Sequence, residues 1–145
     1  MSSATRAALL AVTYLVLTFP IAAVWHLALF PQSMAGPAFR SQPLVAMGLL
    51  STLLQAIVVA YVFPLLNRGG SAVREGLRFG LIMGTFIASY GVLAEAGKFD
   101  VGATASWVLY EGAFFVVQWI VIGIALGLVY QWTARPAPVL TSSAR

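Results

Sequence analysis

Four long apolar runs, separated by short polar breaks, fill most of this chain. They cover about residues 7–30, 44–64, 77–94 and 103–132. A helix that crosses the hydrocarbon core of a bilayer needs about 20 apolar residues, and each run reaches or approaches that length. Inside lipid the backbone must satisfy its own hydrogen bonds, which favours a helix for each run. The pattern predicts an all-α membrane protein with four transmembrane helices in an antiparallel bundle.

The composition leaves room for one domain. Hydrophobic residues make up 61% of the chain and charged residues only 8%, whereas soluble domains carry about 25% charged residues. We expect residues 1–132 to form a single transmembrane domain. Residues 133–145 contain two prolines and little periodicity, so we expect a disordered cytoplasmic tail. The chain has no cysteine, which excludes disulfides, thiolate metal sites and thiol catalysis.

The basic residues predict the orientation in the membrane. Two of them, Arg40 and Lys98, fall in the connections 31–43 and 97–102. The other six fall at the termini, in the connection after the second run or at the start of the third run: Arg6, Arg68, Arg74, Arg78, Arg135 and Arg145. Because basic residues favour the cytoplasmic side, both termini should be cytoplasmic. The net charge of +4 then reflects orientation and lipid contact, so no nucleic-acid partner is expected. The turn residues Arg68, Arg74 and Arg78 should attract anionic lipid headgroups.

A cleaved signal peptide is the competing interpretation of the first run. Arg6, the apolar stretch 7–19 and the small pair Ala22-Ala23 resemble one. The hydrophobicity continues through Leu27–Phe30, past any cleavage point, which favours a retained helix. Cleavage would leave three spans and place the N-terminus outside.

Small residues recur at four-residue spacing in the last two runs. The glycines are Gly76, Gly80 and Gly84 in the third run, and Gly123 and Gly127 in the fourth. Small residues along one face let a neighbouring helix approach closely. We expect the third and fourth helices to touch through these faces, with self-association through the same face as the alternative.

Gln55 and Gln118 lie near the middle of the second and fourth runs. A glutamine in hydrocarbon needs a polar partner, and interhelical hydrogen bonds of this kind contribute about 0.6 to 2 kcal/mol. Structural bonding, to each other or to nearby hydroxyls, is the favoured interpretation over contact with a substrate.

Three titratable residues on different helices fall at one depth, in the outer third of the membrane. They are His26, Glu95 and Glu111. Glu111 is the deepest, and a charge there is costly unless it is paired or hydrated. We expect Glu111 to face the interior near His26, on a stripe with Trp107, Phe114 and Gln118. The alternatives are an interfacial place for His26 and Glu95 and a purely structural hydrogen bond for Glu111.

No motif for a nucleotide, a hydrolytic nucleophile or a zinc protease is present. The titratable set lacks the spacing of a metal site, and the single histidine cannot provide bis-histidine haem ligation within one chain. We therefore expect no metal and no cofactor.

Three short stretches resemble a group of small bacterial four-helix membrane proteins of unknown function: Trp25-His26-x-x-x-Phe30, Glu75–Gly80 and the closing Gly-rich helix. That resemblance implies four spans and assigns no activity.

The sequence favours a non-enzymatic inner-membrane protein, oligomeric or an accessory subunit, with a polar cleft that opens outward. Its candidate cleft residues are Glu111, His26, Glu95, Gln118 and Gln55. The bilayer, itself or another membrane protein would be its partners. A small proton-coupled transporter or channel using Glu111 is the first alternative. A membrane enzyme acting on a lipid or quinone, with Glu111 and His26 as acid and base, is the second.

Overall fold

The computed structural model describes residues 1–31 and 44–134, and within them it is helical with no strand. The elements are α1 (Ser3–Ala23) with the π-helical turn η1 (Val24–Leu29), α2 (Val45–Leu66), α3 (Ala72–Ala88) with the π-helical turn η3 (Ser89–Ala94), and α4 (Thr104–Ala134). All four helices are long and apolar enough to cross a membrane. The predicted all-α class is confirmed, and the four helices are compatible with the predicted four membrane spans.

The helices extend beyond the apolar runs because polar residues begin them. Ser2 precedes α1, and its hydroxyl accepts a hydrogen bond from the Thr5 amide. Ser71 precedes α3 and accepts in the same way from the Arg74 amide. Such caps satisfy backbone donors that lack a helical partner. At the other end of the chain α4 includes residues 133 and 134, which we had assigned to the tail, while 32–43 and 135–145 lie outside the described residues.

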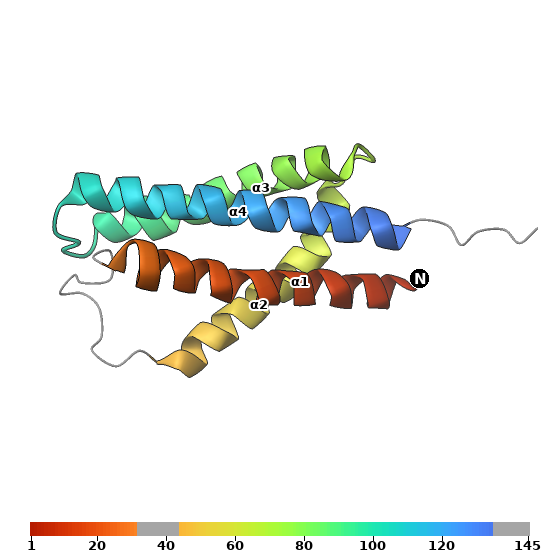
Figure 1. Ribbon diagram of the computed structural model, residues 1–145, viewed down its shortest axis with the longest axis horizontal. Coiled ribbons are helices and arrows are strands. Elements are labelled where there is room, and N and C mark those ends of the chain that lie inside the picture. The colour runs from red at the N-terminus through yellow and green to blue at the C-terminus, as the bar shows by residue number, and fades with distance from the viewer. Residues whose placement is uncertain (32–43, 135–145) are drawn as a thin grey trace, which may run out of the picture.

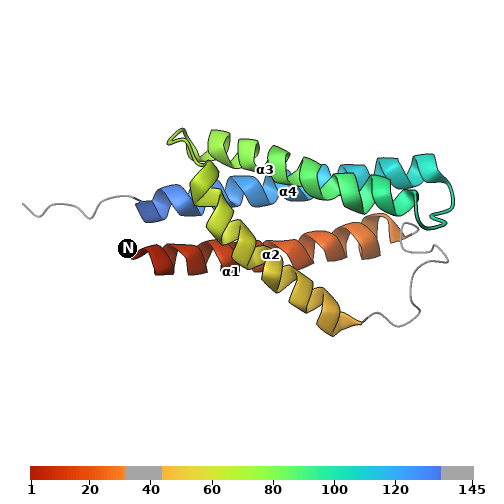
Figure 2. The same cartoon turned by 180° about the vertical axis from the view of Figure 1, so that it is seen from behind.

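Three helices run alongside one another and the fourth crosses them. Figure 1 shows α1, α3 and α4 along the long axis, with the N-terminus, the α2–α3 turn and the end of α4 at one end, here called the proximal end. The end of α1, η3 and the start of α4 lie at the opposite, distal end. Helix α2 is inclined, and its N-terminal half leaves the other helices toward the distal end (Figures 1 and 2).

Helices α3 and α4 are in close contact through glycines. A Cβ atom built on Gly76 would lie 2.7 Å from the carbonyl carbon of Gly123, and one on Gly80 would lie 3.0 Å from that of Trp119. Likewise, a Cβ on Gly127 would lie 2.9 Å from the carbonyl carbon of Ala72. Backbone therefore meets backbone, which only glycine permits. The two glycine faces meet within one chain, as the spacing predicts.

The rest of the proximal half is an apolar core. Phe63 of α2 packs edge-on against Phe79 of α3 with ring centroids 4.9 Å apart, and Tyr14 of α1 lies 5.8 Å from Trp119 of α4. Among the described residues, the largest fully buried side chains are Trp119, Phe63, Phe79, Leu10, Ile122, Leu126 and Val59. Every helix contributes to this cluster, so it holds α2 against the others at the proximal end.

The glycine contact predicts a sharp difference between two Gly→Ala substitutions. Gly80→Ala inserts a methyl group against the α4 backbone and should lower the free energy of unfolding by about 1–3 kcal/mol. Gly112→Ala in α4 is the matched control, since nothing lies within 4 Å of its added Cβ, and it should be neutral. Reversible unfolding in mixed micelles measures both. Equal effects of the two substitutions would contradict the packing role of Gly80.

Candidate functional site

His26 and Glu111 meet at the distal end. His26 comes from η1 and Glu111 from the early part of α4, and the His26 Nδ1 atom lies 3.6 Å from the Glu111 Oε1 atom. Their side chains are 16% and 8% exposed. A carboxylate within a membrane span needs a polar or charged partner. When His26 is protonated, the contact is an ion pair between two helices.

Aromatic rings from η1 and α4 surround this pair. The centroid of the His26 ring lies 4.5 Å from that of the Phe114 ring, and the centroid of the Trp25 ring lies 6.0 Å from that of Phe114. Phe30 contacts both Trp25, at 4.7 Å, and Tyr110, at 5.1 Å. These rings displace lipid and water from around the two titratable groups. Charge–charge and hydrogen-bonding interactions are stronger in such a low-dielectric setting.

Both π-helical turns lie beside the site. In η1 the Phe30 amide donates to the Trp25 carbonyl over 2.8 Å, and this wider turn carries His26. In η3 the Val92 carbonyl accepts a hydrogen bond of 3.2 Å from the buried indole of Trp107, one turn before Glu111 on α4. π-Helical turns occur frequently at functional sites. Neither π-helical turn was predicted from the sequence. The signal available in η3 was the glycine Gly91, which the structure needs because an added Cβ there would lie 2.9 Å from the Phe115 ring.

The predicted stripe on α4 faces inward. Trp107, Glu111, Phe114 and Gln118 are all buried; that they line a cleft stays a prediction. Gln118 contacts α1, where its Nε2 atom lies 3.5 Å from the Thr18 carbonyl oxygen. The stripe therefore connects the His26–Glu111 pair to the middle of the protein.

Glu95 and Gln55 do not join this pair. Glu95 is half-buried beyond η3, and among residues 1–31 and 44–134 its carboxylate makes no hydrogen bond or ion pair. The amide oxygen of Gln55 accepts a hydrogen bond from the Tyr14 hydroxyl, and its Nε2 atom donates to the Ser51 hydroxyl over 3.2 Å. Gln55 therefore belongs to the contact between α1 and α2, and it does not bond to Gln118.

Lys98, the basic residue in the connection before α4, bonds to Tyr90 and not to Glu111. The Lys98 ammonium group donates to the Tyr90 hydroxyl over 3.1 Å and lies 4.4 Å from the centre of that ring. Arg40 falls outside the described residues. Of the cationic partners considered for Glu111, the part of the chain that the structure describes supplies only His26.

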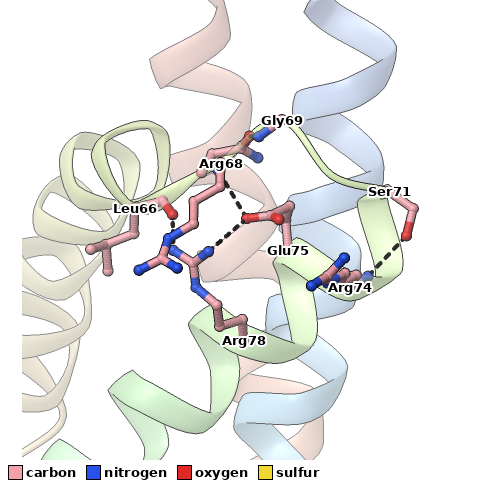
Figure 3. A network of polar contacts seen from close by, with 8 residues as sticks. Leu66, Arg68, Gly69, Ser71, Arg74, Glu75 and Arg78 are labelled. Atoms are coloured by element: carbon pink, nitrogen blue, oxygen red, sulfur yellow. Dashed lines mark hydrogen bonds and ion pairs between the residues drawn. The ribbon is translucent and has the colours of Figure 1, made fainter.

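A second polar cluster closes the α2–α3 turn at the proximal end (Figure 3). The Glu75 carboxylate accepts from the Arg68 amide over 2.9 Å and from the Arg78 guanidinium over 3.3 Å. Arg78 also donates to the Leu66 carbonyl at the end of α2. Glu75 is buried, whereas the Arg68 and Arg74 residues are exposed.

This arrangement changes the expectation for the three arginines. Arg78 is engaged in the fold, since it neutralises Glu75 and caps α2, while Arg68 and Arg74 remain accessible to headgroups. Glu75 was not among the site residues predicted from the sequence. The signal available was its position three residues before Arg78, at a spacing where opposite charges attract on a helix, and in the first turn, where the helix dipole favours an acid.

No group of three or more acidic or histidine side chains among the described residues could hold a metal ion.

Comparison with known proteins assigns no family, since no family model, no curated protein and no solved structure matches this chain. The resemblance to small four-helix membrane proteins therefore stays an expectation. The candidate site rests on geometry alone.

The His26–Glu111 contact predicts energetic coupling between the two residues. His26→Gln and Glu111→Gln should each lower stability, and the double variant should lose less than the sum, with a coupling of about 0.5–3 kcal/mol. Unfolding in mixed micelles measures the cycle. Lys98→Gln combined with Glu111→Gln is the control and should be additive, because Lys98 bonds to Tyr90. Additivity of the His26 and Glu111 substitutions would refute the pair.

Proposed function

We propose that this chain is a non-enzymatic, multi-pass inner-membrane protein that acts as an oligomeric or accessory subunit. Both termini and the α2–α3 turn lie in the cytoplasm, and the His26–Glu111 pair lies toward the outer face. The observation that carries this proposal is the separation of polar and apolar groups along the long axis. The titratable pair is distal, and between it and the Glu75 cluster of the α2–α3 turn the proximal half is closed by apolar side chains and backbone contact.

That separation favours a binding or assembly role over conduction. A channel or carrier needs polar groups that continue across the membrane. Below Glu111, the α4 stripe continues to Gln118 and then reaches Ile122 and Leu126, which have no exposed surface. The contact of α3 with α4 occurs along the same stretch and leaves no room for an added methyl group.

The proximal end carries the groups suited to a cytoplasmic leaflet. Arg68 and Arg74 are exposed beside the turn, where they can contact anionic lipid headgroups. Arg6 is tied inward, donating to the Thr133 carbonyl over 3.3 Å and lying 5.1 Å from the Tyr130 ring centre. This contact joins the start of α1 to the end of α4, which supports the proposal that these two helix ends lie on one side of the membrane.

A small proton-coupled carrier is the second candidate, and the His26–Glu111 distance of 3.6 Å favours it. A carboxylate and an imidazole at this separation can exchange a proton through modest movement or one water. Transport would require the proximal half to open, which means separating α3 from α4.

Labelling of introduced cysteines tests the orientation. Ala103→Cys lies in the distal connection and Ala134→Cys at the proximal end of α4, and both positions are exposed. In intact cells an impermeant thiol reagent should label Ala103→Cys alone, and Ala134→Cys only after the membrane is permeabilised. The reverse order would overturn the assignment of the termini to the cytoplasm.

Two measurements on the full chain test the function. Native mass spectrometry from nanodiscs of native membrane should give a mass well above the 15.4 kDa of one chain, because an oligomer or an accessory subunit has partners. In liposomes that contain a pH-sensitive dye, the wild type should pass protons no faster than protein-free liposomes. A proton flux that Glu111→Gln abolishes would instead establish the carrier, and a single-chain mass would contradict the subunit role.

A further inference from the structure

We propose that one face of α2, carrying Gly48, Ser51 and Gln55, docks against the same face of a second copy of this chain. We call it the Gln55 face. The inference rests on the proposed subunit role and names the partner and the surface. It concerns a part of the molecule that the His26–Glu111 site does not use.

The N-terminal half of α2 has no helix packed on it. Residues 44–50 are all exposed, and Figures 1 and 2 show this half of α2 diverging from the other three helices. The buried residues of α2 begin only at Thr52 and continue to Phe63. About two turns of this helix therefore present their whole circumference to the surroundings.

The Gln55 face places polar groups where lipid cannot satisfy them. Gln55 is near the middle of α2, and so near the middle of the bilayer if α2 spans it. Ser51 is exposed and Gln55 half-buried. Gln55 uses its oxygen for the Tyr14 hydroxyl and one N–H for Ser51. Among the described residues its second N–H has no acceptor, and lipid chains offer none.

Gly48 lets another backbone come close to this face. It precedes Ser51 by three residues and Gln55 by seven, so the three lie on one side of the helix. A Cβ atom built on Gly48 would meet nothing within 4 Å. The glycines of the α3–α4 contact are already used within the chain, whereas the Gly48 surface is open. Small residues beside hydrogen-bonding side chains are the usual composition of helix contacts in membranes.

A second copy suits this face better than lipid does. A carboxamide both donates and accepts, so the Gln55 side chains of two copies can bond to each other or to Ser51 across a two-fold axis. Helix α2 has no charged residue, so two copies can approach without repulsion. The docking leaves the Tyr14 bond in place, because the second N–H of Gln55 is the group that reaches across.

Cysteine cross-linking in native membranes tests the contact in a chain that has no other cysteine. Ser51→Cys should form a disulfide-linked species of twice the chain mass upon oxidation. Leu53→Cys is the matched control, since it lies at nearly the same depth, on another side of α2, and is 47% exposed. It should stay monomeric. Equal cross-linking of both, or a product whose mass is not twice the chain, would overturn the proposal.

Two further variants separate docking from folding. Gln55→Leu removes the bonds within and between copies and should weaken the dimer about three- to thirty-fold. Tyr14→Phe removes only the bond within the chain and should leave dimerisation unchanged. Förster transfer between labelled copies in liposomes measures both. An equal loss for the two variants would overturn the proposal.

Different results would contradict the α2 contact and the oligomeric role. A chain that is monomeric in native nanodiscs contradicts the α2 contact and the oligomeric role together. A chain that is oligomeric but gives no Ser51→Cys cross-link contradicts the α2 contact alone.

Discussion

The contact between the backbones of α3 and α4 is the interaction on which the rest of the structure depends. Between helices in lipid, association relies on close packing and polar contacts, because lipid chains are as apolar as the side chains they would replace. Gly76 and Gly80 on one helix and Gly123 on the other bring the two backbones into direct contact. That contact sets the rotation of α4 about its own axis. The rotation in turn places Glu111 toward the interior, where α1 brings His26 against it.

The glycine contact also explains why the interior is apolar in the proximal half and more polar toward the distal end. Where glycines line the contact, at the proximal end, the helices are close and the remaining space is filled by Trp119, Phe63 and Phe79. Toward the distal end the glycines give way to rings and to two π-helical turns, so the interior there accommodates larger and more polar groups. The arrangement supports an account in which a rigid proximal half carries a polar distal site.

Much of this could be predicted from the sequence, because the relevant signals are local. Hydropathy predicts the four helices, four-residue glycine spacing predicts the α3–α4 faces, and the costly position of Glu111 predicts an inward orientation. The inclination of α2 could not be predicted. Its apolar residues surround the whole helix, so no side is marked as the packed one. The bond of Gln55 to Tyr14 was missed for the same reason. The π-helical turns depend on tertiary contacts, such as the Trp107 indole on the Val92 carbonyl, that leave no periodic signal.

The His26–Glu111 pair is the central claim of this account, and one distance measurement tests it directly. The sample is the chain in lipid bilayers, with ¹⁵N-labelled histidine and ¹³C-labelled glutamate. Because the chain has a single histidine, every labelled ring nitrogen belongs to His26. Solid-state NMR should detect coupling between the His26 ring nitrogens and a glutamate side-chain carboxyl carbon, and the coupling should vanish in Glu111→Gln. Coupling that is absent from the wild type, or that survives in Glu111→Gln, would contradict the account.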